Sequence, residues 1–217
     1  MTDDARELPL FPLNTVLFPS LPLPLHIFEE RYRLMIGECA ATDNLFGVCL
    51  IKEGVEVGGP AEPFEIGTVA RISELERLPD GRMNLMTFGT SRFRLEAVIQ
   101  REPYLIGRVV VLEPGTDSPA PDLIGDVADR LLRYLRDVRG AARLPDRNDL
   151  LTDADRLSYL AAATLGLPPR ERQSFLETDS AVDRLRQARD LLRREIENAR
   201  LFGRAIDGQT IGPFSRN

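Results

Sequence analysis

Three residue types are almost missing from this chain of 217 residues: it has no tryptophan, one lysine (Lys52) and one histidine (His26). A phosphate-binding loop needs a lysine that follows spaced glycines and precedes Ser or Thr, and Lys52 has neither neighbour. A Ser-Lys dyad would need the same lysine, but Lys52 lies at a predicted strand end and is expected to face solvent. The single lysine therefore predicts that this chain neither hydrolyses ATP nor cleaves peptide bonds.

Any nucleophilic system built on a histidine would have to use His26, between Leu25 and Ile27 at the expected entry to a helix. That position favours a packed, hydrogen-bonded structural histidine. A zinc site formed by His26, Cys39 and Cys49 would need a fourth ligand that the sequence does not supply. We therefore expect no metal, no cofactor and no enzymatic activity.

The two cysteines form no CxxC spacing, which favours two semi-buried, reduced thiols in a reducing cytoplasm over a disulfide. No apolar run approaches the roughly 18 residues that a membrane span requires. The acidic start, MTDDAREL, lacks the basic and apolar segments of a signal peptide. These absences predict a soluble, cytoplasmic protein without a membrane partner.

Positive charge is scarce in the first half of the chain. Residues 1–115 contain 17 acidic and 11 basic side chains, a net charge of −6, whereas residues 116–217 contain 17 of each. Binding to a phosphate backbone depends on clustered Lys and Arg, so a nucleic-acid partner is not expected.

Proline is abundant near the start, where Pro9, Pro12, Pro19, Pro22 and Pro24 alternate with Leu and Phe. Proline fixes φ and lacks an N–H donor, so this stretch is expected to be extended or turning. Two residues apart in a strand, Pro22 and Pro24 remove donors from the same edge, while Leu21, Leu23 and Leu25 point to the opposite face. That edge is expected to pair with no further strand.

The rest of residues 1–115 favours closely spaced strands with one short helix, which suggests a small barrel or sandwich. The helix is predicted over residues 29–40, and the strands over residues 45–51, 64–72, 75–78, 83–88, 93–99 and 104–112.

A Pro/Gly/Ser-rich segment, residues 113–121, is the predicted boundary. Beyond it, apolar residues recur at helical spacing over residues 123–138, 157–165 and 182–199, with a short helix over residues 169–177. Residues 207–217 are expected to form a frayed end.

The opening stretch also carries a family resemblance. LPLFPLNTVLFPSLPLPLHIFEERYRLMI, residues 8–36, resembles the start of the Lon protease N-terminal domain, which also occurs as stand-alone bacterial proteins. Further matches follow in the family's order: GTVARI at 67–72, DGRMNL at 80–85, FGTSRFRL at 88–95 and PYLIG at 103–107. The resemblance covers residues 7–113, and the helical remainder to about residue 203 fits less specifically.

The resemblance implies an α+β fold: a PUA-like pseudo-β-barrel over residues 1–115, then an all-α helical bundle over residues 116–217. It also implies a function. Full-length Lon proteases join an ATPase to a Ser-Lys protease, and the lysine of each is missing here. What remains is a non-catalytic module that recognises substrate proteins. Its expected partners are unfolded or exposed apolar protein segments, with a separate Lon-type protease as a further candidate.

A surface for such partners is expected near the proline edge. A small core can bury only part of the apolar side chains there, and the rest would form an exposed apolar patch. Arginine and tyrosine suit the rim of a desolvated interface. The candidate contact residues are Phe11, Leu13, Phe18, Leu21, Leu23, Arg31 and Tyr32. The alternative is that the five apolar residues are simply buried in the core.

Two other function classes stay open. The PUA-like fold class includes RNA readers, although the acidic first half argues against RNA, and fold analogy is a weak reason. A small-molecule enzyme would require a deep pocket with a titratable pair. A continuous basic groove would favour RNA binding, and a deep pocket with a titratable pair would favour a small-molecule enzyme.

Overall fold

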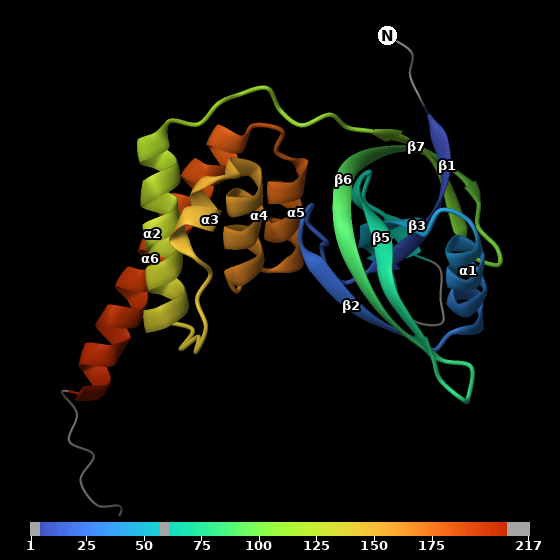
Figure 1. Ribbon diagram of the computed structural model, residues 1–217, viewed down its shortest axis with the longest axis horizontal. Helices are drawn as coiled ribbons and strands as arrows, with labels where there is room; N and C mark the ends of the chain where they lie inside the picture. The colour runs from blue at the N-terminus through green and yellow to red at the C-terminus, as the bar shows by residue number, and fades with distance from the viewer. Residues whose placement is uncertain (1–4, 57–60, 208–217) are drawn as a thin grey trace, which may run out of the picture. The chain divides into compact units, whose positions relative to one another are not determined.

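The computed structural model describes residues 5–56 and 61–207, with side chains as far as residue 201. The chain divides into two compact units (Figure 1). The barrel unit comprises Met1–Thr116 and Gly166–Ser180, and the helical unit comprises Asp117–Leu165 and Ala181–Asn217. Apart from residue 207, the predicted frayed end lies outside the described residues.

Five strands of the barrel unit form an irregular ring. In spatial order they are β1, β7, β6, β5 and β3, and a parallel pairing of β3 with β1 closes the ring. The other pairings between the described strands are antiparallel, with β4 added to β3 and β2 added to β6. The strands are β1 (Arg6–Leu13), β2 (Pro22–Ile27), β3 (Leu45–Gly54), β4 (Ala61–Pro63), β5 (Ile66–Arg77), β6 (Met83–Gln100) and β7 (Leu105–Val111).

Helices provide the rest of the fold. They are α1 (Glu30–Ala41), α2 (Pro121–Asp137), α3 (Arg147–Leu151), α4 (Ala154–Thr164), α5 (Pro169–Glu177) and α6 (Ala181–Asp207). A pseudo-barrel followed by a helical region confirms the predicted α+β fold. The predicted strands over residues 83–88 and 93–99 are parts of one long strand, β6.

The main core of the barrel unit lies between the ring and α1. Helical spacing places four α1 side chains on one buried face: Tyr32, Met35, Ile36 and Cys39. They pack with strand residues such as Phe11, Phe46 and Leu85. The hairpin beside this core turns at Gly81, whose φ of +83° is a conformation that glycine adopts without strain.

Helix α5 belongs to the barrel unit, so the predicted division at residues 115/116 differs from the observed one over residues 166–180. The physical reason is a set of polar contacts to the sheet. The Gln173 side-chain amide donates to the Ile66 carbonyl oxygen at 2.9 Å.

Arg92, which is 5% exposed on β6, makes the second part of this attachment. Its Nη1 donates to the carbonyl oxygens of Leu176 at 2.9 Å and Thr178 at 3.4 Å, and its Nη2 pairs with Asp179 Oδ1 at 2.7 Å. An arginine at this position looks like an outward-facing charge in the sequence, but here it satisfies the carboxyl end of a helix.

The helical unit packs α6 against α2 and α4. Arg184 of α6 is buried, pairs with Asp155, donates to Ser158 Oγ at 2.9 Å and lies 4.4 Å from the Tyr159 ring centroid. Because every hydrogen-bonding group of the guanidinium is a donor, these acceptors make its burial tolerable.

Two negative findings apply to residues 5–56 and 61–207 only. None of the helices there is long and apolar enough to cross a membrane. The same residues contain no cluster of three or more His, Cys, Asp or Glu side chains that could hold a metal ion.

Candidate functional site

Strand β2 lies at an edge of the sheet. It pairs with β6 in the register Pro22↔Phe88 to Ile27↔Met83, and none of the other described strands pairs with it. The edge without a partner is the one on which Pro22 and Pro24 lack donors, as the sequence predicts. Carbonyl oxygens therefore dominate this edge.

The pleat of β2, β6 and β5 separates two faces. One face carries Leu25, Leu85 and Leu75, which are paired across the three strands and pack against the core. The neighbouring positions point the other way. Four outward positions of β2 and β6 carry apolar side chains, which we call the outer strip: Pro22, Pro24, Met86 and Phe88.

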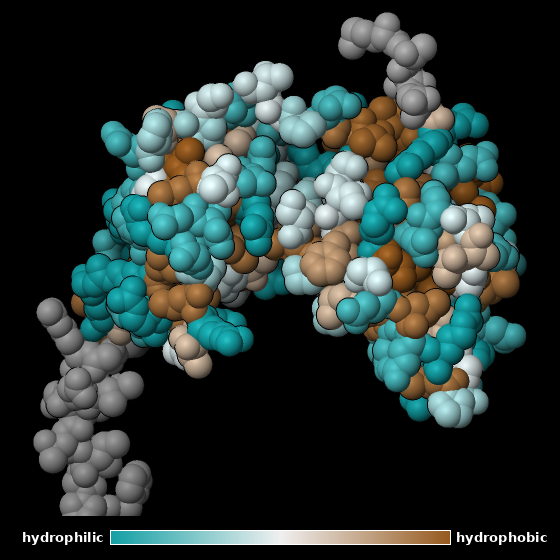
Figure 2. Space-filling model, in the orientation of Figure 1, coloured by the Kyte–Doolittle hydropathy of each residue, from teal (hydrophilic) through white to brown (hydrophobic). Residues whose placement is uncertain are grey.

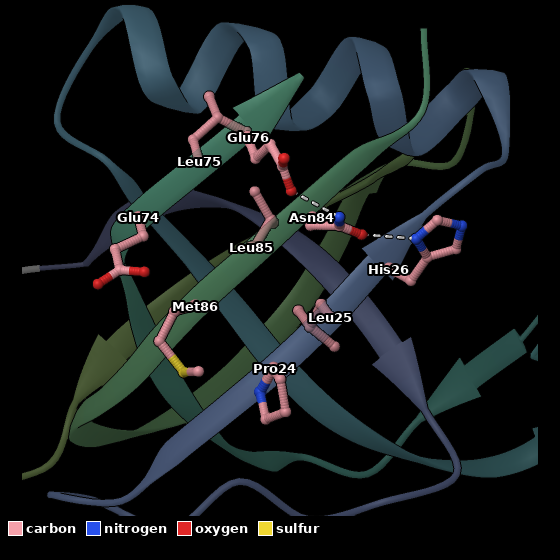
Figure 3. A pocket seen from close by; sticks show the side chains of 9 residues that line it. All are labelled: Pro24, Leu25, His26, Glu74, Leu75, Glu76, Asn84, Leu85 and Met86. Carbon is pink, nitrogen blue, oxygen red and sulfur yellow. Dashed lines mark hydrogen bonds between the residues drawn. The ribbon is translucent and has the colours of Figure 1, made fainter. Parts of the chain in front are cut away.

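A hollow, here called the outer groove, lies on this three-stranded part of the sheet. Its volume is about 630 Å³, and three consecutive residues from each strand line it, 24–26 of β2, 74–76 of β5 and 84–86 of β6 (Figure 3). Pro24 and Met86 lie side by side along one row, in register with Glu74. The groove therefore joins an apolar surface to acidic side chains.

The neighbouring row across β5, β6 and β2 consists of Glu76, Asn84 and His26, which are connected by hydrogen bonds. Asn84 Nδ2 donates to Glu76 Oε2 at 2.8 Å, and Asn84 Oδ1 lies 2.8 Å from His26 Nδ1 (Figure 3). Because the amide oxygen accepts, His26 Nδ1 must carry the proton, and Nε2 of the neutral ring is an acceptor. The predicted structural histidine is thus hydrogen-bonded, but its side chain lies at the surface.

A smaller hollow of about 160 Å³ shares residues 24–26 with the outer groove. It reaches the exposed ring of Phe28 and the carboxylate of Glu56, which accepts the Asn14 backbone N–H at 2.9 Å. The two hollows are therefore adjacent along the C-terminal half of β2.

Most of the predicted contact residues lie deeper than expected. Four of them are buried: Phe11, Leu13, Phe18 and Tyr32. For the first three, the alternative that the apolar candidates belong to the core therefore holds. Phe11, Leu13 and Tyr32 nevertheless line the smaller hollow. They can shape that hollow, but they do not form an apolar patch.

The other three candidates are half-buried. Leu21 precedes β2 and Leu23 packs on the core. Arg31 pairs with Glu29 at 3.0 Å, and its guanidinium carbon lies 4.5 Å from the Tyr32 ring centroid. Burial is the main reason why the pKa of Tyr32 is raised, and nearby Arg31 opposes the shift.

The contact residues offered by the sequence do not include the outer strip or His26, although Pro22, Pro24 and His26 have predicted structural roles there. Phe88 is 42% exposed, and Met86 is half-buried on the same face. A pattern in the sequence could have revealed them, because residues 83–88 carry apolar side chains on both faces of a strand that needs to bury only one.

Comparison with known proteins gives a consistent result. Residues 7–194 match the family model described as the ATP-dependent protease La (LON) substrate-binding domain. Lon protease 2 of Myxococcus xanthus is 29% identical over 99% of this chain, and Lon protease of Desulfovibrio desulfuricans is 30% identical over 91%. The chain spans about a quarter of each relative, 26% and 23%, and no catalytic domain is indicated.

Solved structures agree on the fold. A Lon N-terminal domain protein from Xanthomonas campestris superimposes with a TM-score of 0.67 at 34% identity, covering 84% of this chain and 96% of that one. The N-terminal domain of Mycobacterium avium complex Lon protease gives 0.70 at 19% identity, over 86% and 98%. The ring of strands, the helical region and the match over residues 7–194 lead to one conclusion: the chain belongs to the Lon substrate-binding domain family.

Proposed function

We propose that this chain is a non-catalytic module that binds exposed segments of other proteins, and that the outer strip and outer groove are its binding surface. The observation that carries the proposal is the exposed apolar row on β2 and β6, where Phe88 is 42% exposed beside Met86 and Pro22. An outward strand face is usually polar when no partner covers it.

Three further features support a polypeptide as the partner. The family description names substrate binding. The open edge of β2 offers carbonyl acceptors to the N–H groups of an extended chain. The groove is shallow and joined to a second hollow, which suits several side chains in succession rather than one enclosed small molecule.

Leu21 and Leu23, retained from the sequence-based candidates, would support the strip from its edge. Arg31 would lie beside the smaller hollow. Figure 2 shows hydrophobic residues reaching the surface among hydrophilic ones. The carboxylates of the outer groove give no support to the RNA-binding alternative.

The test uses a fluorescein-labelled peptide of alternating Leu and Gln, which carries no charged side chain, and measures its binding by fluorescence anisotropy. Phe88→Ser should weaken binding about 5- to 30-fold, because the peptide loses about 1–2 kcal/mol of apolar contact. The matched control is Ile99→Ser, since Ile99 is 41% exposed on the same strand but belongs neither to the outer strip nor to the lining of either hollow.

The proposal fails if the wild-type chain does not bind the peptide, or if Phe88→Ser and Ile99→Ser bind it equally well while both remain folded by circular dichroism.

We also propose that the chain acts in the cytoplasm, which two unpaired buried cysteines support. A separate Lon-type protease is a further proposed partner, and co-purification from cell extract would test it.

A further inference from the structure

We infer that the outer groove selects exposed segments in which arginine or lysine stands beside apolar residues. This inference rests on the proposed function and specifies its substrate class. Its basis is the charge of the two hollows: four carboxylates line them, Glu74 and Glu76 in the outer groove and Glu29 and Glu56 in the smaller one, and neither hollow is lined by Arg or Lys.

Three of these four carboxylates have no basic side chain as a described partner. Glu29 is the exception, since it pairs with Arg31. Glu76 accepts from the Asn84 amide and Glu56 from a backbone N–H, so each is oriented without being neutralised. Glu74 is exposed and in register with Met86. Negative charge therefore remains directly beside the apolar row.

The hydrogen-bonding groups that face the groove lead to the same class of ligand. The carboxylates accept, Nε2 accepts in the neutral His26 ring that donates from Nδ1, and the open edge of β2 offers the carbonyls of Pro22 and Pro24. A guanidinium has five donors and no acceptor, and an ammonium has three. Carboxylate and phosphate side chains would instead add acceptors to a surface that is already rich in them.

Apolar contact supplies the second half of the selectivity. Pro24 and Met86 lie in the row next to His26 and Asn84, so one extended segment can place an apolar side chain and a basic one on adjacent rows. Arg71, which pairs with Phe88 in the sheet register, lines neither hollow.

The experiment compares three labelled peptides that share one neutral core of alternating Leu and Ser and carry two flanking residues that are Arg, Gln or Glu. At low salt the Arg peptide should bind about fivefold more tightly than the Gln peptide, as two surface ion pairs can supply, and the Glu peptide should bind most weakly. Raising the salt concentration should reduce the difference.

A triple variant, Glu56→Gln, Glu74→Gln and Glu76→Gln, should lose the preference for Arg while still binding the Gln peptide. The matched control removes three exposed carboxylates outside both hollows (Glu53→Gln, Glu96→Gln and Glu113→Gln) and should keep the preference, which separates a local effect from net charge.

The possible failures are distinct. If none of the peptides binds, the proposed function fails. If the Gln peptide binds as tightly as the Arg peptide, or if the control triple variant loses the preference as the groove variant does, binding stands and the inferred substrate class is overturned. Tightest binding of the Glu peptide would overturn it as well.

Discussion

Cys49 illustrates what the barrel interior does to a single side chain. It is 1% exposed in a small cluster of apolar residues that includes Leu10, Val69 and Phe93. Burial raises the pKa of its thiol from the ordinary value of 9.0 to about 12, because a thiolate would lose its hydration there. The native protein therefore keeps this proton at a pH where the unfolded chain releases it.

The sign of the resulting pH dependence follows directly. Between about pH 9 and pH 12 the native state binds more protons than the unfolded state, so the free energy of unfolding falls as pH rises. Urea denaturation at pH 8, 9.5 and 10.5 should show a decline of up to about 1.4 kcal/mol per pH unit from this thiol. Cys49→Ala should show a smaller decline, and an unchanged slope would contradict the assignment.

At the scale of an element, β2 is fixed to β6 by its strand pairing and also by backbone hydrogen bonds of the residues just before it. The backbone N–H of Ser20 donates to the Gly89 carbonyl at 2.9 Å, and the Gly89 N–H donates to the Leu21 carbonyl at 3.0 Å. A Cβ on residue 89 would lie 2.2 Å from the carbonyl oxygen of Phe18. Only glycine permits this close approach of two backbones.

Gly89→Ala should therefore destabilise the chain by about 2–3 kcal/mol, as overpacking against a backbone does. The control is Gly37→Ala in α1, where nothing lies within 4 Å of the added Cβ. That change should stabilise the chain by about 0.5–1 kcal/mol, since alanine loses less entropy in a helix. Opposite signs in urea midpoints are expected; two changes of the same sign would contradict the packing at residue 89.

Elements were also the scale at which the sequence was most informative. The spacing of Tyr32, Met35, Ile36 and Cys39 predicts the buried face of α1, and proline chemistry predicts the free edge of β2. Both predictions, the buried helix face and the free strand edge, depend only on local geometry, and a short stretch of sequence is enough to specify it.

At the scale of the whole molecule, the barrel unit is discontinuous in the sequence. It takes α5 from beyond the linker, and Arg92 and Gln173 make the attachment. Replacing Arg92 with Met keeps much of the buried volume but leaves two carbonyl oxygens without their donor. The expected cost in the full chain is about 2 kcal/mol.

That cost should disappear in a chain cut after residue 116, because α5 and its carbonyls are then missing. Urea denaturation of four proteins, the full and the cut chain with Arg92 or with Met, forms a double-mutant cycle. A similar loss of stability from Arg92→Met in both lengths would show that Arg92 acts within the sheet and not through α5.

The candidate site lies between these scales. The opening stretch contains the strand edge at which we propose the surface, but most of the leucines and phenylalanines that it offers as contact residues face the core. Phe18 and Leu23 point inward, whereas Met86 and Phe88, more than sixty residues away, face outward beside Pro22 and Pro24. The pairing register of β2 with β6 decides this, and no local pattern contains it.

By itself the sequence determined the family, the α+β class, the helix faces and the unpaired proline edge, because each follows from local spacing or from the covalent structure of a residue. The tertiary structure alone decided three other points: α5 joins the barrel unit, His26 is joined through Asn84 to Glu76, and apolar and acidic side chains meet in one groove. Each depends on contacts between residues far apart in the chain, whose register and burial are set only when the ring closes.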